Sequence, residues 1–342
     1  MAERTPPSTL AEMRAIIGEF PGPDREAGAE ATAHQAQLTK PAGALGRLEE
    51  IAIWMATWQG KHPPTCVHPR TAVFAGNHGV AAQGVSAYPA AVTAQMVKNF
   101  IDGGAAVNQL CRAVDADLRV YEMALEEPTE DFTQGPAMSE EECAMAIAYG
   151  MMAVEPGIDL LAVGEMGIAN TTAAAALNAA LFGGSGTDWV GPGTGVAGPM
   201  LSHKIAVVDR ALALHRPLAG DGFDKLRRLG GREFAAMVGA IMAARMARVP
   251  VLLDGYAACA AAAALQSMAP GALDHCLVAH RSAEPGHQRL LEKLGMAPLL
   301  DFGMRLGEAS GATLAVAIVK AALACHTGMA TFADAGVSGK SS

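Results

Sequence analysis

Aromatic and charged side chains are scarce in this sequence of 342 residues. Phe, Tyr and Trp make up 5% of it, and Asp, Glu, Lys and Arg only 17%. Its 25 basic residues form no dense cluster, Arg227-Arg228 being the longest basic run, and the formal net charge is −9. A chain without a basic track has little to hold a phosphate backbone, which argues against nucleic-acid binding.

Motifs for metals and for activated nucleophiles are missing too. The ten histidines include no HExxH pair, no His, Cys and carboxylate group has zinc spacing, and no GxSxG sequence occurs. The six cysteines lie far apart, without a CxxC pair. We therefore expect no bound metal, no cofactor held by cysteines, and reduced thiols.

Long uninterrupted apolar runs are also absent. Asp254 divides the run 249–265 and Lys320 interrupts 312–325, so neither reaches the roughly 18 apolar residues that a membrane span needs. The first ten residues are charged and proline-rich, where a signal peptide needs an apolar stretch. The sequence predicts a cytoplasmic protein with no membrane span.

What the sequence does contain is small apolar residues, in short runs that alternate with helical patterns. Hydrophobic residues make up 51% of the chain, and 38 residues are glycine. The runs typical of strands are 71–76, 118–121, 158–164, 189–191, 249–254 and 276–280. The helical stretches between and around them include 90–100, 140–152, 170–181, 204–214 and 256–267. This alternation predicts an α/β fold, with a Rossmann-like parallel sheet covered by helices on both faces.

Helical patterns also occupy both ends of the chain. They cover 10–18, 23–37 and 45–58 at the start, and 287–294 and 308–325 at the end. We expect these terminal helices to pack together as a smaller helical domain. The predicted division is therefore N-terminal helices over 1–60, an α/β core over 61–285, and C-terminal helices over 286–342 that complete the small domain.

Polar and small residues follow each predicted strand. These strand ends are Gly76-Asn77-His78-Gly79, Glu122, Gly164-Glu165-Met166-Gly167, Gly191-Pro192-Gly193-Thr194-Gly195, Asp254-Gly255 and His280-Arg281-Ser282. A single such glycine usually marks only a turn. Because ligands collect at the carboxyl ends of parallel strands, six such ends together predict a binding site.

Two of these segments have more than one interpretation. Asn170-Thr171, just after Glu165, opens a helix whose N-terminus could hold phosphate, although capping of that helix is about as common a role. Residues 193–198 formally match GxGxxG, but Pro199 follows and the preceding strand is very short, so the match is weak. Lys204, at the start of the next predicted helix, could reach a phosphate in that loop or simply be solvated.

Glu308 is an unusual charge because it opens an almost wholly apolar helix. A carboxylate there could interact with the helix dipole in the first turn, or serve as a partly desolvated base whose pKa rises with burial. The histidines at 78, 280 and 287 could line a cleft or be ordinary hydrogen-bonded core residues.

Taken together, these segments resemble those of the nicotinate-nucleotide–dimethylbenzimidazole phosphoribosyltransferases, the family that makes the lower-ligand nucleotide of cobalamin. The resemblance is carried by LTKPAGALGRLE (38–49), NHGVAAQGVSAYP (77–89), VGEMGIANTT (163–172), GPGTG with HKIAVVDRAL (191–212), PVLLDGY (250–256), HRSAEPGH (280–287) and MRLGEASGA (304–312). These segments span nearly the whole chain in the family's order.

The resemblance implies a homodimeric pentosyltransferase that works without a cofactor or metal. It would move 5-phosphoribosyl from nicotinate mononucleotide to 5,6-dimethylbenzimidazole, giving α-ribazole 5′-phosphate and nicotinate. It implies Glu308 as the catalytic base and Glu165 as a second catalytic carboxylate. The substrate-binding positions it implies are Asn77, His78, Met166, Gly167, Gly193, Lys204, Ser282 and Leu306. Of these, Gly167, Gly193 and Lys204 would bind phosphate, and Met166 and Leu306 would line the base pocket.

The chain also departs from this family. Asn77 stands where the family commonly has Asp, and Gln83 where it often has Glu, so this chain lacks a carboxylate at both positions. Two other classes stay open: a nicotinamide-dinucleotide oxidoreductase that uses the 193–198 glycines, and a non-enzymatic binder of aromatic bases or nucleotides.

Overall fold

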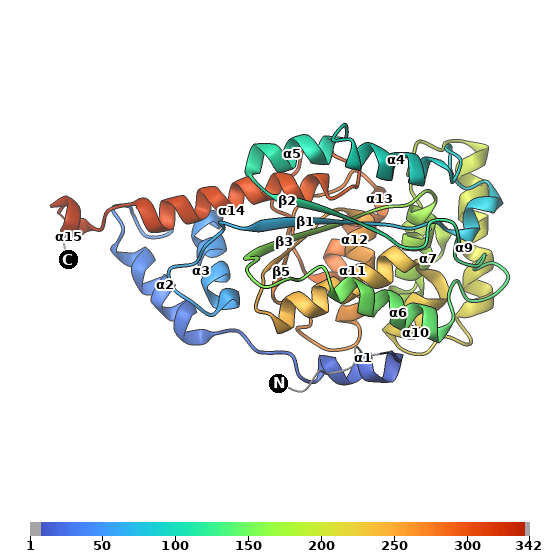
Figure 1. Cartoon of the computed structure of the whole chain (residues 1–342), viewed down its shortest axis with the longest axis horizontal. Coiled ribbons are helices and arrows are strands. Elements are labelled where there is room, and N and C mark those ends of the chain that lie inside the picture. Colours follow the sequence, from blue (N-terminus) through green and yellow to red (C-terminus); the bar gives the residue numbers. More distant parts are fainter. Residues whose placement is uncertain (1–7, 339–342) are drawn as a thin grey trace.

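The structure is a computed structural model that describes residues 8–338, and its centre is a five-stranded parallel sheet (Figure 1). The spatial order of the strands is β2-β1-β3-β4-β5. Their bounds are β1 Pro69–Ala75, β2 Asp117–Glu122, β3 Leu160–Met166, β4 Val251–Leu253 and β5 Cys276–Val278. All four strand pairs are parallel. The predicted α/β fold class is confirmed.

The central strands are apolar on both sides because both faces of the sheet are covered. In β3, Leu161 and Val163 join one hydrophobic cluster, whereas Leu160 and Ala162 join the cluster on the opposite face. Every residue of β1 is buried. Side chains alternate between the two faces of the sheet along a strand. A strand that is buried on both faces is therefore a continuous apolar run in the sequence.

Two layers of helices sandwich the sheet (Figure 1). One face packs on α4, α5 and α14, and the other on α11 and α12, with α6 beyond α11 and α7 beyond α12. The bounds in these layers are α4 Val92–Ile101, α5 Ala106–Val114, α6 Glu140–Met151, α7 Asn170–Phe182, α9 Pro199–His215, α10 Gly222–Leu229, α11 Arg232–Met246, α12 Tyr256–Gln266 and α14 Ser310–Gly328. Short helical turns lie at η1 Gly79–Gln83 and α8 Gly186–Trp189.

Helices from the two chain ends meet at one end of the molecule (Figure 1). Helix α2 (Arg25–Gln37) packs on α3 (Arg47–Gln59), α3 packs on α14, and Leu38 bridges to Thr331 just before α15 (Phe332–Ala335). The other terminal helices pack on the α/β layers, α1 (Leu10–Ile17) on α6 and α13 (Pro285–Leu294) on α12. The division of the chain at residues 60 and 285 stays a prediction.

Helix α14 corrects one expectation. It is the single helix of the described part that is long and apolar enough to cross a membrane, because one charge, Lys320, does not lower its hydropathy sufficiently. Half of its apolar window is buried, and it packs along β1, β3 and β4. Its apolar character therefore has a structural cause in the core. The N-terminal residues 1–7, to which the signal-peptide argument refers, lie outside the described residues.

Three local predictions were wrong. Residues 189–191 form no strand, because Trp189 ends α8 and the chain continues as a loop into α9. Lys204 lies in the second turn of α9, which begins at Pro199. Glu308 lies just before α14, with Ala309 as N-cap, so it is not in the helix's first turn. The prediction also omitted α5, α10 and α11.

The topology points to the location of a site. The chain order reverses between β1 and β3, since β2 lies to one side of β1 while β3, β4 and β5 follow on the other. In a doubly wound sheet of this order, the crevice at the carboxyl ends of the strands beside this reversal is where ligands bind.

Candidate active site

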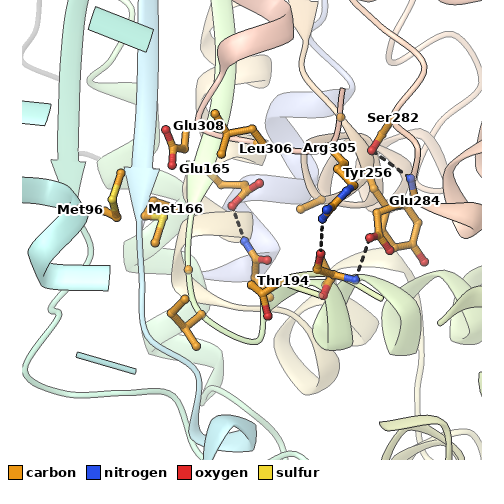
Figure 2. A pocket seen from close by; sticks show the side chains of 18 of the residues that line it. Met96, Glu165, Met166, Thr194, Tyr256, Ser282, Glu284, Arg305, Leu306 and Glu308 are labelled. Atoms are coloured by element: carbon orange, nitrogen blue, oxygen red, sulfur yellow. Dashed lines mark hydrogen bonds between the residues drawn. The ribbon is translucent and has the colours of Figure 1, made fainter. Parts of the chain in front are cut away.

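A cavity of about 500 Å³ opens at the carboxyl ends of β3, β4 and β5. Its walls come from the segments that follow these strands, from α4, and from the turn before α14 (Figure 2). It is lined by Tyr88, Val92, Met96, Glu165, Met166, Gly167, Ile168, Asn170, Thr171, Gly193, Thr194, Gly255, Tyr256, Ala257, His280, Ser282, Glu284, Arg305, Leu306, Gly307 and Glu308.

The structure brings most of the predicted site residues to this cavity. Those that line it are Glu165, Met166, Gly167, Gly193, Ser282, Leu306 and Glu308. Asn77, His78 and Lys204 are buried and are not among the lining residues. Four separate segments of the sequence therefore share one cavity: 165–167, Gly193, Ser282 and 306–308. The strand-end argument predicted the first three, and the family resemblance implied the fourth.

Glu308 reaches the cavity through a tight turn that rests on β3. Its backbone N–H donates to the carbonyl of Glu165 at 3.0 Å, and both Glu308 and Ala309 have left-handed backbones, with φ of 62° and 57°. A Cβ at Gly164 would lie 2.3 Å from the nitrogen of Ala309, so only glycine in β3 lets the turn approach. Left-handed conformations of residues other than glycine cost energy and cluster at functional sites.

The pKa values of two carboxyl groups in the cavity are raised. Burial, together with the negative charge of Asp254, raises the pKa of Glu308 to about 7. Burial, then the charges of Asp254, Glu233 and Glu308, raises the pKa of Glu165 to about 8, against a hydrogen bond that Asn170 Nδ2 donates to it. A carboxyl group that titrates near neutral pH is suited to accept a proton.

Apolar side chains surround the two carboxyl groups. Met96 of α4, Met166 at the end of β3 and Leu306 line the cavity there (Figure 2). Met166 is buried, whereas Leu306 is 55% exposed and lies at the opening. We call this part, with Glu165 and Glu308, the carboxyl end of the cavity. Its wall suits a flat apolar ring that carries a proton to be removed.

The loop of residues 191–195 lines a second part of the cavity through Gly193 and Thr194, and we call this part the loop end. Gly193 N–H donates to Glu284 Oε1 at 2.7 Å, and Gly193 C=O accepts from Arg305 Nη1 at 3.2 Å (Figure 2). A Cβ at Gly193, whose φ is 53°, would lie 2.6 Å from Thr171 Oγ1. The loop follows the helix α8, whereas a dinucleotide-binding GxGxxG follows a strand, so the structure weakens the dinucleotide interpretation.

Lys204 lies directly behind this loop. Its Nζ donates to Thr171 Oγ1 at 2.8 Å and to the Gly191 carbonyl at 3.1 Å, and the side chain is almost fully buried. Burial lowers the pKa of Lys204 to about 8, although the nearby charge of Glu284 opposes this shift. Through Thr171, Lys204 brings positive charge to the N-terminal turn of α7, a position that favours anions.

Asn77 and His78 lie beneath the cavity wall. Asn77 Nδ2 donates to the Leu125 carbonyl at 2.9 Å, and His78 Nε2 lies 2.5 Å from Glu233 Oε1. A Cβ at Gly167 would lie 3.4 Å from His78 Nε2, so His78 packs under this glycine. These contacts support the wall, and direct substrate binding by either residue stays a prediction.

Comparison with known proteins identifies the family. The family model described as Phosphoribosyltransferase matches residues 20–337. Nicotinate-nucleotide–dimethylbenzimidazole phosphoribosyltransferases from Sinorhizobium medicae and Rhizobium etli are 59% and 60% identical over 329 residues, or 96% of this chain and 97% of each relative. The chain belongs to this phosphoribosyltransferase family.

The fold agrees with this membership. The crystal structure of the nicotinate-nucleotide–dimethylbenzimidazole phosphoribosyltransferase from Thermus thermophilus matches with a TM-score of 0.85 and 41% sequence identity. The match covers 93% of this chain and all of that one. A second crystal structure from the same organism matches with a TM-score of 0.86 at 42% identity.

Several lining residues of this phosphoribosyltransferase were not among the predicted site residues. Arg305 and Glu284 both belong to segments on which the resemblance rests, so the sequence held a signal for them. Thr171 was considered only as a helix cap or part of a helix N-terminus. Tyr88 likewise belongs to such a segment, 77–89. Met96 had no signal, because α4 reaches the cavity only through the tertiary packing.

Proposed function

We propose that the chain transfers 5-phosphoribosyl from nicotinate mononucleotide to 5,6-dimethylbenzimidazole, giving α-ribazole 5′-phosphate and nicotinate, in the assembly of the cobalamin nucleotide. The observation that carries the assignment is the pair of raised-pKa carboxyl groups, Glu165 and Glu308, that a member of this family presents in an apolar cavity. The substrates are those for which its relatives are named.

The bond changes need a base and no acid. The C1′–N bond to the pyridinium ring breaks, and its electron pair neutralises the ring nitrogen, so nicotinate leaves without a proton. One benzimidazole nitrogen attacks C1′ from the opposite side, which inverts the anomeric carbon from β to α. The other nitrogen loses its proton to Glu308. General base catalysis of this kind is typically worth about 10²–10⁴-fold.

The two ends of the cavity take different parts of the substrates. The apolar wall at Met96, Met166 and Leu306 receives the benzimidazole beside Glu308. The α7 N-terminus, Ser282, Arg305 and the loop around Gly193 receive the phosphate, with Lys204 behind them. Fixing the donor by its phosphate orients C1′ towards the acceptor, and such positioning lowers the barrier further.

Product analysis tests this function. The protein is incubated with nicotinate mononucleotide and, in separate reactions, 5,6-dimethylbenzimidazole, benzimidazole and adenine, and the products are identified by mass spectrometry. We expect α-ribazole 5′-phosphate and nicotinate in equal amounts from the first reaction. A dinucleotide titration followed by fluorescence is the counter-test, since tight NAD binding without ribosyl transfer would favour the oxidoreductase alternative. A protein that binds both substrates and forms no product would be the non-enzymatic binder.

No metal or cofactor enters this reaction, because no pyrophosphate leaves and the leaving ring needs no activation. We therefore expect full turnover in excess EDTA. Loss of activity that only an added divalent cation restores would contradict the metal-free mechanism.

We also infer that the enzyme is a homodimer in the cytoplasm, as the family resemblance implies. Apolar side chains left exposed near the cavity opening support a partner surface there, among them Tyr88 and Leu306. Light scattering after size exclusion tests the dimer, and a monomer at micromolar concentration would refute it. Fractionation of cells that express the full chain tests the location.

A further inference from the structure

We propose that Glu284 is a positioning residue for the donor nucleotide: its carboxylate fixes the 191–195 loop between Lys204 and Arg305, and the loop in that position completes the phosphate-binding end of the cavity. This inference rests on the proposed function. It adds a carboxylate at the end of the cavity where a phosphate dianion binds, a place where its charge alone would be unfavourable.

Three charged side chains hold this loop. Glu284 Oε1 accepts the N–H of Gly193 at 2.7 Å, and Arg305 Nη1 donates to the carbonyl of the same residue at 3.2 Å. Lys204 Nζ donates to the carbonyl of Gly191 at 3.1 Å. The loop is thus fixed from α9, from the N-cap of α13 and from the turn before α14. Hydrogen bonds to ionised groups are about twice as strong as neutral ones.

Glu284 is itself rigidly held. Its backbone N–H donates to Ser282 Oγ at 3.3 Å, and the N–H of Ser282 donates to His287 Nδ1 at 2.8 Å. As N-cap of α13, Glu284 makes no side-chain hydrogen bond to its own helix, and the carboxylate turns to the loop instead. Only 4% of the residue is exposed, so its position is set before a substrate arrives.

The second carboxylate oxygen of Glu284, Oε2, shows how closely the 191–195 loop approaches the start of α13. Oε2 is buried and has no hydrogen-bond partner among the described residues. A Cβ on Gly191 would lie 2.1 Å from Oε2 and 2.7 Å from Pro285 Cδ. A buried acceptor without a partner costs free energy. The contact of Oε1 with the loop and the neighbouring cations must offset that cost.

The charge of Glu284 also acts on Lys204. It raises the pKa of Lys204, in opposition to burial, and Lys204 and Arg305 in turn oppose the upward shift that burial gives the pKa of Glu284. The other titratable side chains near Glu284, Lys204 and Arg305 are Tyr256 of α12 and His287 of α13. Glu284 therefore favours the cationic form of Lys204, which is the form that attracts phosphate.

Glu284 affects phosphate affinity in two opposite ways. Its hydrogen bond to the loop raises the affinity, and the direct repulsion by its negative charge lowers it. Two substitutions separate these effects. Glu284→Ala removes both the loop contact and the charge. Glu284→Gln keeps an oxygen that accepts the Gly193 N–H and removes only the charge. In the wild type that charge repels the phosphate directly, but it also favours the protonated form of Lys204. The glutamine variant is therefore the matched test of position against charge.

The experiment measures KM for each substrate and kcat, together with the affinities for nicotinate mononucleotide and for inorganic phosphate by calorimetry. For Glu284→Ala we expect donor KM and donor Kd to rise at least about tenfold. Acceptor KM and kcat should change less than about threefold. For Glu284→Gln at pH 6.5 we expect donor KM within about threefold of the wild-type value.

The pH dependence gives a readout that a merely structural role would not move. Removing the charge lowers the pKa of Lys204 below its value of about 8. Donor KM of Glu284→Gln should therefore begin to rise at a lower pH than donor KM of the wild type. The wild-type profile, measured in the same buffers, is the reference.

Gly191→Ala tests the same contact from the loop side. The added methyl group collides with Glu284 Oε2, so the loop or the carboxylate must shift, and donor KM should rise as in Glu284→Ala. Two matched controls are Gly22→Ala, where a Cβ meets nothing within 4 Å, and Glu292→Ala, at an exposed position of α13. Both should retain the wild-type donor KM.

Each outcome has a defined meaning. An unchanged donor KM in Glu284→Ala would overturn the inference while leaving the function in place. So would equal losses for donor and acceptor with a lower Tm and no rescue by glutamine, which is the result a structural role gives. If the wild type binds nicotinate mononucleotide in a Glu284-dependent way and forms no product, the proposed function fails and the inference stands. If the wild type does not bind it, both fail.

Discussion

The two ends of the cavity both contain buried carboxylates, yet their electrostatic surroundings are opposite. At the carboxyl end, burial and the charge of Asp254 raise the pKa values of Glu165 and Glu308 to about 8 and about 7, and the charge of Glu233 adds to the shift of Glu165. At the loop end, burial raises the pKa of Glu284 as well, but the charges of the nearby Lys204 and Arg305 oppose this shift.

This difference separates two tasks. Buried carboxyl groups beside like charges bind a proton more strongly than exposed ones, so they exchange it near neutral pH, which suits proton removal. A carboxylate among cations stays in one position and organises a loop. Under the proposed function, the cavity therefore divides into an end that moves a proton and an end that holds a phosphate. The following experiments ask whether the two ends are separable.

The largest effect is expected at the carboxyl end. Glu308→Gln keeps the shape of the side chain and removes the base, so we expect kcat to fall by roughly 10²–10⁴-fold. Donor KM should stay within about threefold, because the loop end is untouched. Steady-state kinetics with both substrates measures the split, and circular dichroism checks the fold. Near-normal turnover in this variant would remove Glu308 from its role, and Glu292→Gln, on the exposed face of α13, is the control.

The converse variant is Lys204→Met, which removes the cation behind the loop. Loss of a charge-assisted contact predicts a rise in donor KM of roughly 10–100-fold, with acceptor KM nearly unchanged. The matched substitution Lys293→Met changes a lysine in the last turn of α13 and should have no effect. Equal losses for both substrates would show that the two ends do not act separately.

The pH profile should divide in the same way. Below pH 7 Glu308 is protonated and cannot accept a proton, so kcat should rise about tenfold per pH unit on the acid side and level off near pH 7. Above pH 8 Lys204 loses its charge, so donor KM should rise there while kcat holds. Separate kcat and KM profiles between pH 5.5 and 9.5 check this. If kcat and donor KM changed together at the same pH, the two ends of the cavity would not act separately.

The smallest effect concerns stability. The pKa of Glu165 is raised in the folded protein, so between about 4.5 and 8 the folded state holds a proton that the unfolded state has released. Its contribution to stability is therefore present at low pH and is lost as the pH rises towards 8. Glu165→Gln can still accept the hydrogen bond from Asn170 Nδ2 and carries no charge. We expect the Tm of this variant to exceed the wild-type Tm at pH 8 and to equal it at pH 5. An equal gain in Tm at both pH values would show that the raised pKa of Glu165 is not the cause.

Much of the carboxyl end could be predicted from the sequence. The strand ends at Glu165 and at Asp254 follow buried apolar runs, and parallel strands bring such ends to one edge. The role of Glu308 came from the family resemblance. Its position did not, because the left-handed backbone of Glu308 and Ala309 depends on contact with Gly164, which no local pattern reveals.

The loop end was harder to predict. Residues 189–191 have the composition of a short buried strand, yet a run of three residues can equally end a helix, as it does at Trp189. Helix α11 was omitted because it is buried nearly all round, between α6 and α12, and so lacks the polar face that makes a helix recognisable. Glu284 belongs to the family segment 280–287, but its contact with the loop could not be predicted, because its partner Gly193 is 91 residues away in the sequence.

The hydrogen bond from the N–H of Glu308 to the carbonyl of Glu165 has a consequence for how this enzyme can change. The bond joins the backbones of the two residues, so the backbone sets the distance between their carboxyl groups. Neighbouring side chains can change without altering that distance. Substitutions in the apolar wall can alter which ring is accepted without disturbing the proton acceptor. An insertion of one residue in the turn 304–307 would displace Glu308 from β3. We therefore expect point mutations in the wall to change the acceptor base, whereas a new spacing of the carboxyl groups would require a different turn.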